Sequence, residues 1–208
     1  MALGDFFDWL LCAIKLKKKV TLGIYGEVNV GKTTLANKIS MDWAGEKMGK
    51  TSRIPHETRT VQKKERVTIP LKGGRKLVLN LLDMPGLATK VDYRAFTKYG
   101  IRAKEAKKRA KEATAGVIEA IRWLDNVDTV LAVMDATKDP LTQVNLTLMG
   151  NLEAKGIPVI IVANKIDRKS ANPKRIKEAF PDYPIVPISA LKGKNIDHLY
   201  EAIGKYAK

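Results

Sequence analysis

Residues that build disulfide or metal frameworks are nearly missing from this chain. Among its 208 residues Cys12 is the only cysteine, so neither an internal disulfide nor a cysteine-built zinc site can form. The two histidines, His56 and His198, are far apart in the sequence, which argues against a histidine metal cluster and a Ser-His-Asp triad. No apolar run approaches the roughly 18 residues of a membrane-spanning helix.

Acidic residues are few relative to basic ones. The chain has 38 lysines and arginines against 22 aspartates and glutamates, a formal net charge of +16. Such an excess usually indicates a polyanionic partner, either nucleic acid or an anionic membrane surface, although a lysine-rich, well-solvated surface would give the same charge. Because Asp5 and Asp8 replace a positive start and no small-residue cleavage site follows, the N-terminus is not typical of a secretory signal. We therefore expect a cytoplasmic protein, with a membrane-peripheral one as the alternative.

Strand-like and helix-like segments alternate along the chain. The short apolar runs typical of buried strands are residues 19–25, 129–135, 158–165 and 185–189, and residues 65–83 form two further strands joined through Gly73-Gly74. Helical patterns cover residues 33–49, 101–124, 139–155, 172–180 and 195–207, whereas irregular structure is expected over 50–64 and 84–100. The alternation predicts an α/β fold with helices on both faces of the sheet. The length favours a single domain, residues 19–208, after a short N-terminal part, residues 1–18.

Residues 3–16 fit an amphipathic helix that precedes this domain. Its broad apolar face gathers Leu3, Phe6, Phe7, Leu10, Ala13 and Ile14. Lys15 and the run 17–19 follow. Three uses stay open: packing on the chain's own domain, docking on an anionic membrane surface through the lysines, or binding a partner protein.

The segment GEVNVGKT, residues 26–33, lies between the first strand and the first helical pattern. Gly26, Gly31, Lys32 and Thr33 satisfy the pattern G-x-x-x-x-G-K-[ST], in the context that its mechanism needs. The glycines let backbone N–H groups surround phosphates, the lysine supplies charge between the β- and γ-phosphates, and the threonine hydroxyl can bind Mg²⁺. The N-terminus of the following helix favours the anion. The segment therefore predicts a nucleotide-phosphate site.

The segment NKID, Asn164–Asp167, follows another buried strand and distinguishes between bases. The Asp167 carboxylate can accept hydrogen bonds from the ring N–H and the exocyclic amine of guanine, whereas adenine has no such pair of donors. Lys165 can lay its stem along the base, and Asn164 can tie this segment to the phosphate loop. Guanine nucleotides, GTP and GDP, are the predicted ligands.

Five motifs in this order resemble those of GTPases of the translation-factor-related class, closest to the Era-like group. They are GEVNVGKT, PHETR, DMPG, NKID and ISA, and the resemblance covers about residues 19–207. It implies the three-layer P-loop GTPase fold with a mostly parallel, six-stranded sheet. It also implies that Asp83 holds Mg²⁺, that the Gly86 N–H contacts the γ-phosphate, and that the backbone at Ser189 and Ala190 faces the guanine oxygen. The nucleotide loop would then comprise Gly26, Glu27, Val28, Asn29, Val30, Gly31, Lys32, Thr33 and Thr34.

The threonine that senses Mg²⁺ and the γ-phosphate is assigned by the same resemblance. Era-like chains often read P-x-T-T-R, and here Pro55, Thr58 and Arg59 keep that spacing, with Glu57 in place of the first threonine. Thr58 is therefore the expected residue, and Thr60 is the alternative. Thr58 would join Thr33 and Asp83 as a Mg²⁺ ligand.

Hydrolysis of GTP would depend on Lys32, Thr58, Gly86 and Asn29. Where the best-known GTPases carry a glutamine that orients the attacking water, this chain carries Leu87, which cannot form that hydrogen bond. In several relatives an asparagine at the position of Asn29 is associated with a bridging K⁺ ion. Slow turnover that K⁺ accelerates is expected. The alternatives are a turn role for Asn29 and a module that binds GTP with negligible hydrolysis.

The region 98–111 is strongly basic. It contains Lys98, Arg102, Lys104, Lys107, Lys108, Arg109 and Lys111. This region is either a solvated outer helix face or a surface that contacts phosphates of rRNA or the ribosome without reading sequence. Era proper carries a C-terminal RNA-binding KH domain and this chain ends before one, so a role in ribosome assembly does not transfer directly. A membrane-peripheral GTPase, a nucleotide-dependent dimer and, more remotely, a P-loop kinase are the other possibilities.

Overall fold

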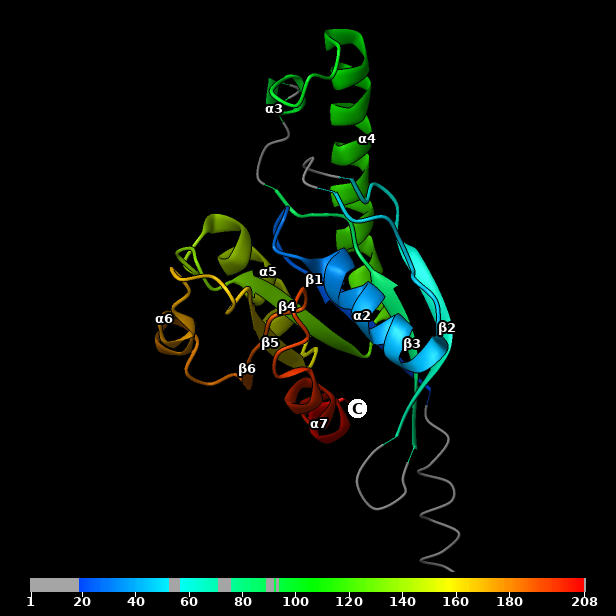
Figure 1. Cartoon of the computed structure of the whole chain (residues 1–208), viewed down its shortest axis with the longest axis vertical. Helices are drawn as coiled ribbons and strands as arrows, with labels where there is room; N and C mark the ends of the chain where they lie inside the picture. Colours follow the sequence, from blue (N-terminus) through cyan, green and yellow to red (C-terminus); the bar gives the residue numbers. More distant parts are fainter. Residues whose placement is uncertain (1–18, 53–56, 71–75, 89–91, 93, 208) are drawn as a thin grey trace, which may run out of the picture.

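A single six-stranded sheet organises the chain, with strand order β2-β3-β1-β4-β5-β6 (Figure 1). The computed structural model describes residues 19–52, 57–70, 76–88, 92 and 94–207, so the predicted helix over residues 3–16 lies outside the described residues. The strands are β1 Val20–Tyr25, β2 Gln62–Pro70, β3 Lys76–Asp83, β4 Thr129–Asp135, β5 Val159–Asn164 and β6 Ile185–Pro187. The pair β2–β3 is antiparallel and the other pairs are parallel, which confirms the predicted mostly parallel sheet.

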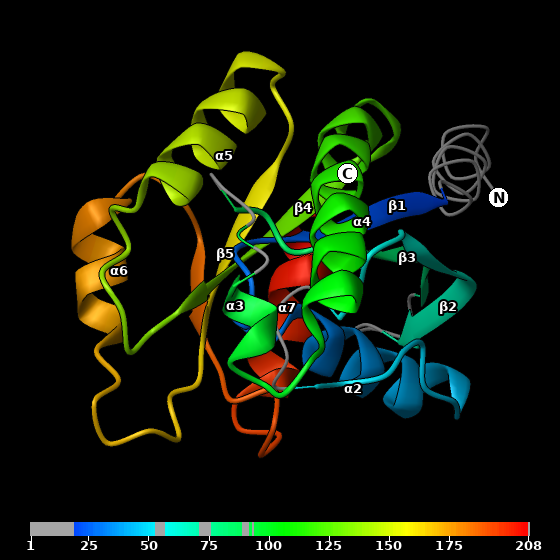
Figure 2. The same cartoon turned by 90° about the horizontal axis from the view of Figure 1, so that it is seen from above.

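Helices cover both faces of this sheet. They are α2 Lys32–Ala44, α3 Arg94–Thr97, α4 Ala103–Arg122, the 3₁₀ helix η2 Trp123–Asn126, α5 Gln143–Ala154, α6 Pro173–Ala179 and α7 Ile196–Tyr206. In Figure 2, α2 and α7 lie on one side of the sheet and α4 and α5 on the other. Among the described residues, none of the helices combines the length and apolar character needed to cross a bilayer.

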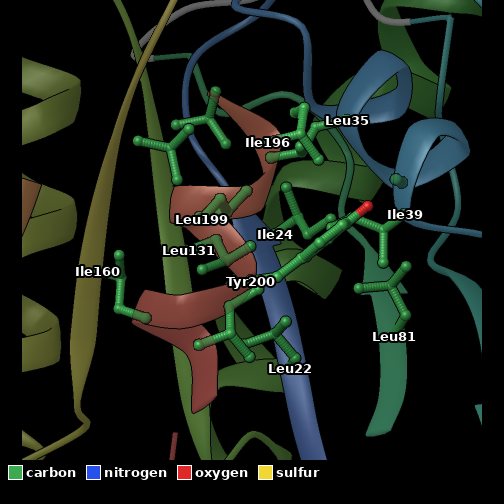
Figure 3. Packing of buried hydrophobic residues seen from close by; sticks show 14 of the residues in the cluster. Leu22, Ile24, Leu35, Ile39, Leu81, Leu131, Ile160, Ile196, Leu199 and Tyr200 are labelled. Carbon is green, nitrogen blue, oxygen red and sulfur yellow. The ribbon is translucent and has the colours of Figure 1, made fainter. Parts of the chain in front are cut away.

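Alternate residues of the central strands feed two separate cores. Leu131 of β4 packs with α2 and α7, as Figure 3 shows, whereas its neighbours Val130 and Ala132 belong to the core beneath α4 and α5. All seven residues of β4 are buried. A strand covered on both faces needs apolar side chains at every position, which explains why these strands read as continuous apolar runs.

The register of the parallel strands aligns their carboxyl ends. Ile24 of β1 pairs with Asp83, the last residue of β3, and Asp135, the last residue of β4, pairs with Asn164, the last residue of β5. One edge of the sheet therefore collects the ends of four neighbouring strands. Ligands of open α/β sheets bind at this edge.

Two elements differ from the sequence prediction. Strand β2 begins at Gln62, inside the stretch expected to be irregular. Its start was not predicted because β2 is an edge strand whose first half carries polar side chains. Its pattern is also broken by an irregularity between Lys64 and Val67, where Arg66 has a φ of 55°. The short helix α3 interrupts the stretch 84–100 because Phe96 is buried against Ala106 and Ala113 of α4. In Figure 1 this end of α4 projects beyond the sheet with α3 beside it.

Candidate phosphate-binding site

The glycine-rich loop joins the end of β1 to the start of α2, as predicted. Gly31 has a φ of 102° and Asn29 a φ of 62°, a region that residues with a Cβ rarely adopt. A Cβ added to Gly31 would lie 2.4 Å from Nδ2 of Asn164, so only glycine permits this approach of the loop to the end of β5. Helix α2 begins directly after Gly31 and directs its N-terminal N–H groups toward the loop. The arrangement is that of an anion site.

Lys32 is held by the carbonyl groups of this loop. Its Nζ donates to the carbonyl oxygens of Gly26 at 3.1 Å and Glu27 at 2.8 Å. Burial lowers the pKa of Lys32 to about 8, against the opposing influence of Asp83 and Glu27. A buried ammonium group gains stability when an anion pairs with it. Lys32 is therefore placed to receive a phosphate.

Three side chains from separate segments meet beside the loop. Thr33 Oγ1 donates to Oδ2 of Asp83 at 2.7 Å, and the hydroxyl of Thr58 lies 2.9 Å from Thr33 Oγ1. Because the Thr33 proton is directed at Asp83, Thr58 is the donor in the second contact. Thr60, the alternative to Thr58, is exposed. The geometry brings together the three residues predicted to bind Mg²⁺.

The environment of Asp83 fits a divalent cation. The residue is fully buried, and its Oδ1 has no hydrogen-bond partner within the described part of the chain. Burial raises the pKa of Asp83 to about 6, although the hydrogen bond from Thr33 and the charge of Lys32 act in the opposite direction. One carboxylate and two hydroxyls are hard oxygen ligands, the kind that Mg²⁺ takes together with water and phosphate.

Asn164 connects two loops, as its position in NKID predicts. Its Nδ2 donates to the carbonyl oxygen of Val30 at 2.8 Å, and its Oδ1 accepts from the N–H of Ala190 at 3.0 Å. Asp167, three residues on, accepts from Ser189 Oγ at 2.6 Å, and this hydrogen bond lowers the pKa of Asp167. Asp167 is thereby kept ionised and oriented.

Ser189 and Ala190 contact the NKID segment through hydrogen bonds. Both are buried, and the N–H of Ser189 donates to the carbonyl oxygen of Lys194 at 3.1 Å. The N–H of Ala190 donates to Oδ1 of Asn164, and neither Ser189 nor Ala190 lines the cavity described below. That this backbone faces a guanine oxygen stays a prediction. In this structure Ser189 acts on the site through its hydroxyl contact with Asp167.

A carboxylate that the sequence analysis did not single out fixes Lys165. Asp135 Oδ2 accepts from Lys165 Nζ at 2.6 Å, and the same Nζ donates to the carbonyl oxygen of Asn29 at 2.7 Å. Burial opposes ionisation of Asp135, but hydrogen bonds from Lys165 and Thr137 hold its pKa below the ordinary value. Only its position could have indicated Asp135 from the sequence, because Asp135 ends β4, the strand beside β5, which leads into NKID.

Some of these residues line a cavity of about 380 Å³. The predicted residues in its wall are Val28, Asn29, Gly31, Lys32, Thr33, Thr34, Thr58, Gly86, Asn164, Lys165 and Asp167. The predicted residues outside the wall are Gly26, Glu27, Val30, Asp83, Ser189 and Ala190. The wall residues that were not predicted are Lys50, Thr51, Ser52, Glu57, Arg168 and Leu191. Of these, Glu57 lies in PHETR, Arg168 directly follows NKID and Leu191 directly follows ISA, so the usable signal was a position in or beside a motif.

Leu87 is packed in the core and does not line this cavity. Its side chain is 7% exposed and belongs to the cluster that includes Met84 and Ala120. Its N–H donates to the carbonyl oxygen of Gly26 at 3.1 Å. The position after DMPG therefore contributes no polar side chain to the cavity.

Comparisons with known proteins agree with one another on the kind of protein that this chain resembles. A family model described as "50S ribosome-binding GTPase" matches residues 21–165. GTPase Era of Clostridium acetobutylicum is 31% identical over 189 residues, which cover 88% of this chain and 54% of that protein. Translation initiation factor IF-2 of Wolinella succinogenes is 31% identical over 193 residues, covering 86% of this chain and 16% of that protein.

Solved structures of Era share the fold. An Era variant from Aquifex aeolicus bound to GDP and AlF₄⁻ superposes with a TM-score of 0.70 at 29% identity, covering 92% of this chain and 57% of that chain. Era in complex with MgGDPNP and nucleotides 1506–1542 of 16S ribosomal RNA gives a TM-score of 0.67 at 27% identity, with the same coverage of 92% and 57%. The chain spans about half the length of the Era proteins that it matches.

Proposed function

This chain belongs to the 50S ribosome-binding GTPase family, and we propose that it binds GTP and hydrolyses it to GDP and phosphate, with Mg²⁺ as cofactor. The observation that carries the proposal is that three groups of functional residues meet in space. A phosphate-binding loop, the hydroxyls of Thr33 and Thr58 beside Asp83, and the oriented carboxylate of Asp167 come from distant parts of the sequence and meet at one cavity. Such convergence supports a nucleotide site better than any single motif does.

Base selection is assigned to Asp167 and Lys165. The hydrogen bond from Ser189 orients the Asp167 carboxylate, which would accept both N–H donors of guanine. Adenine would leave that carboxylate without donors, and an unpaired polar group in a binding site is penalised strongly. Lys165 is pinned between Asp135 and the carbonyl of Asn29, so its aliphatic stem has a fixed place along the base.

Phosphate binding and hydrolysis are assigned to the opposite end of the cavity. Lys32 and the loop N–H groups would neutralise the β- and γ-phosphates, the N–H of Gly86 would contact the γ-phosphate, and Thr58 would report its presence. Thr33, Thr58 and Asp83 would hold Mg²⁺, which when bound supplies charge neutralisation to the phosphates. Because the side chain of Leu87 is in the core, turnover without help is expected on the order of 10⁻⁴ to 10⁻² s⁻¹.

We further propose that K⁺ accelerates this turnover through Asn29. Asn29 lines the cavity with a φ of 62°, and its carbonyl oxygen is fixed by Lys165 at 2.7 Å. Single-turnover phosphate release, compared in KCl and NaCl at equal ionic strength, should be faster in KCl. Equal rates in the two salts would contradict the role assigned to Asn29.

The partner that best matches the charge is RNA, alone or in the ribosome. The cations of region 98–111 are exposed, apart from Arg109, which is partly buried and pairs with Glu105. A cluster of this kind binds phosphates without reading bases. The complex of Era with a 16S ribosomal RNA fragment supports RNA as the partner class but is a property of that protein.

The enzymatic part is tested with Lys32→Ala and the matched control Lys38→Ala. Lys38 lies on the same helix but is half-buried, pairs with Asp42 and does not line the cavity, so its loss removes one charge outside the cavity. Fluorescent GTP binding and single-turnover hydrolysis should be lost in Lys32→Ala and kept in Lys38→Ala. Hydrolysis that survives in Lys32→Ala would exclude the assigned site.

A further inference from the structure

Helix α4 touches both loops that border the γ-phosphate end of the cavity. Glu112 of α4 forms an ion pair with Arg59, the residue directly after Thr58. One turn further on, a Cβ added to Gly116 would lie 2.5 Å from the carbonyl oxygen of Arg59 and 3.1 Å from Cβ of Pro85 in DMPG. Because the packing is this close, a movement of either loop changes the contacts of α4 directly.

The same helix carries the basic surface. We call residues 94–111, comprising α3 and the N-terminal half of α4, the basic arm. Its exposed cations are Arg94, Lys98, Arg102, Lys104, Lys107, Lys108 and Lys111. The two parts of the arm are held together by Phe96, which is buried against Ala106 and Ala113. The arm therefore follows α4 as one unit.

Glu112 joins the cavity to the arm electrostatically. The hydrogen bond from Arg59 is the main cause that lowers the pKa of Glu112, with Lys108 and Arg109 adding to it. Lys108 and Glu112 are four residues apart on one helix face, the spacing of an intrahelical ion pair. If Arg59 withdraws, Glu112 is left to pair with Lys108, which would no longer be available to a polyanion. Closure of Thr58 and Arg59 onto the cavity therefore makes the end of the arm more positive.

We propose that the basic arm is an RNA-backbone surface whose affinity is set by the nucleotide, through the contacts of Arg59 with Glu112 and Gly116. This inference rests on the proposed function, because it requires both GTP binding and an RNA partner. Thr58, held at Thr33 in this structure, links occupation of the cavity to the position of Arg59. RNA is the favoured partner because the arm offers a row of exposed cations and few aromatic or apolar side chains.

Linkage makes the proposal quantitative. Suppose that the GTP-bound protein binds RNA more tightly than the GDP-bound protein by some factor. RNA must then raise the affinity of the protein for GTP, relative to its affinity for GDP, by the same factor. Couplings of this kind are typically about 5- to 150-fold. We expect about tenfold here, because a single ion pair and one helix contact carry the signal.

The test compares Glu112→Gln with Glu105→Gln. Both remove one negative charge from α4, but Glu105 pairs with Arg109 on the same helix and, among the described residues, not with a cavity loop. The full chain, loaded with GDP or a non-hydrolysable GTP analogue, is titrated into a short fluorescein-labelled RNA hairpin and followed by anisotropy. Fluorescent nucleotides confirm loading in the same samples, and phosphatidylserine vesicles serve as the competing polyanion.

The expected result is a difference between the two variants in nucleotide dependence. Wild type and Glu105→Gln should bind the hairpin about tenfold more tightly with the analogue than with GDP. In Glu112→Gln the ratio should fall toward one, mainly because the GDP form gains affinity. RNA should slow release of the analogue from wild type by the same factor, and not from Glu112→Gln.

Several outcomes would overturn the inference, and they separate it from the proposed function. The coupling would be refuted, with GTP and RNA binding unaffected, if the two loaded forms of wild type bound RNA equally well. It would also be refuted if the ratio of their RNA affinities stayed the same in Glu112→Gln. Nucleotide-dependent binding to vesicles with no binding to RNA would refute RNA as the partner. If the GTP analogue did not bind at all, the proposed function itself would be refuted.

Discussion

Replacing Asp83 by asparagine should stabilise the metal-free protein while removing its response to Mg²⁺ and GTP. Burial raises the pKa of Asp83 from an ordinary 3.8 to about 6, so the ionised carboxylate disfavours the folded state at neutral pH. At about 1.36 kcal/mol for each unit of pKa, the penalty is about 3 kcal/mol. The asparagine oxygen keeps the hydrogen bond from Thr33, but its amide must find a new partner. A net gain of about 1 to 3 kcal/mol in the free energy of unfolding is therefore expected.

The assay is urea unfolding of wild type and Asp83→Asn in EDTA, with pH as the second variable. A raised folded-state pKa gives stability that is complete below 3.8 and lost as the pH rises through about 6. The advantage of the variant should thus be full at pH 7.5 and shrink toward pH 5. With Mg²⁺ and a GTP analogue the order should reverse, because only wild type gains binding energy.

Asp135→Asn is the control of opposite sign. Its carboxylate lies at the end of β4, which β1 separates from β3, but it pairs with Lys165 at 2.6 Å, and its pKa is lowered. Its replacement should destabilise the metal-free protein near neutral pH. If Asp83→Asn is less stable than wild type in EDTA, or gains as much from Mg²⁺ and the analogue, the assignment of Asp83 as a buried cation ligand is refuted.

Three further substitutions follow from the same geometry. Tyr25→Phe should leave stability unchanged or raise it by about 1 kcal/mol in urea unfolding, because the buried Tyr25 hydroxyl has no hydrogen-bond partner among the described residues; a clear loss would reveal a partner. Gly31→Ala should weaken GTP binding at least tenfold in a fluorescent titration, because its Cβ would meet Asn164 and its φ is 102°; unchanged affinity would exclude the loop geometry. Thr58→Ala should slow single-turnover hydrolysis and Thr60→Ala should not, since only Thr58 lies beside Thr33; the reverse would exchange their roles.

The sequence predicted the site well where one motif sits at the end of one buried strand. GEVNVGKT after β1 and NKID after β5 are adjacent to their strands, so the parallel sheet brings them together whatever the loops do. The choice of Thr58 over Thr60 came from a resemblance, and the contact with Thr33 agrees with it. Asn164 was expected to tie NKID to the phosphate loop, and its hydrogen bond to Val30 does so.

Site residues and elements were not predicted where they depend on contacts between segments that are distant in the sequence. Asp135 has no spacing relation to Lys165 that a motif could record, since the two come from adjacent strands. Lys50, Thr51 and Ser52 reach the cavity from a loop without periodicity. The start of β2 was missed because an edge strand needs no apolar side chains. The contact of Gly116 with Arg59 is a matter of helix placement, which composition does not specify.

The most direct test of the central claim is calorimetric titration of GTP and ATP into the protein with Mg²⁺. The Asp167 carboxylate, oriented by Ser189, has two donors to pair with in guanine and none in adenine. GTP should therefore bind about 10³-fold or more tightly than ATP. ATP binding as tight as GTP binding would contradict the account.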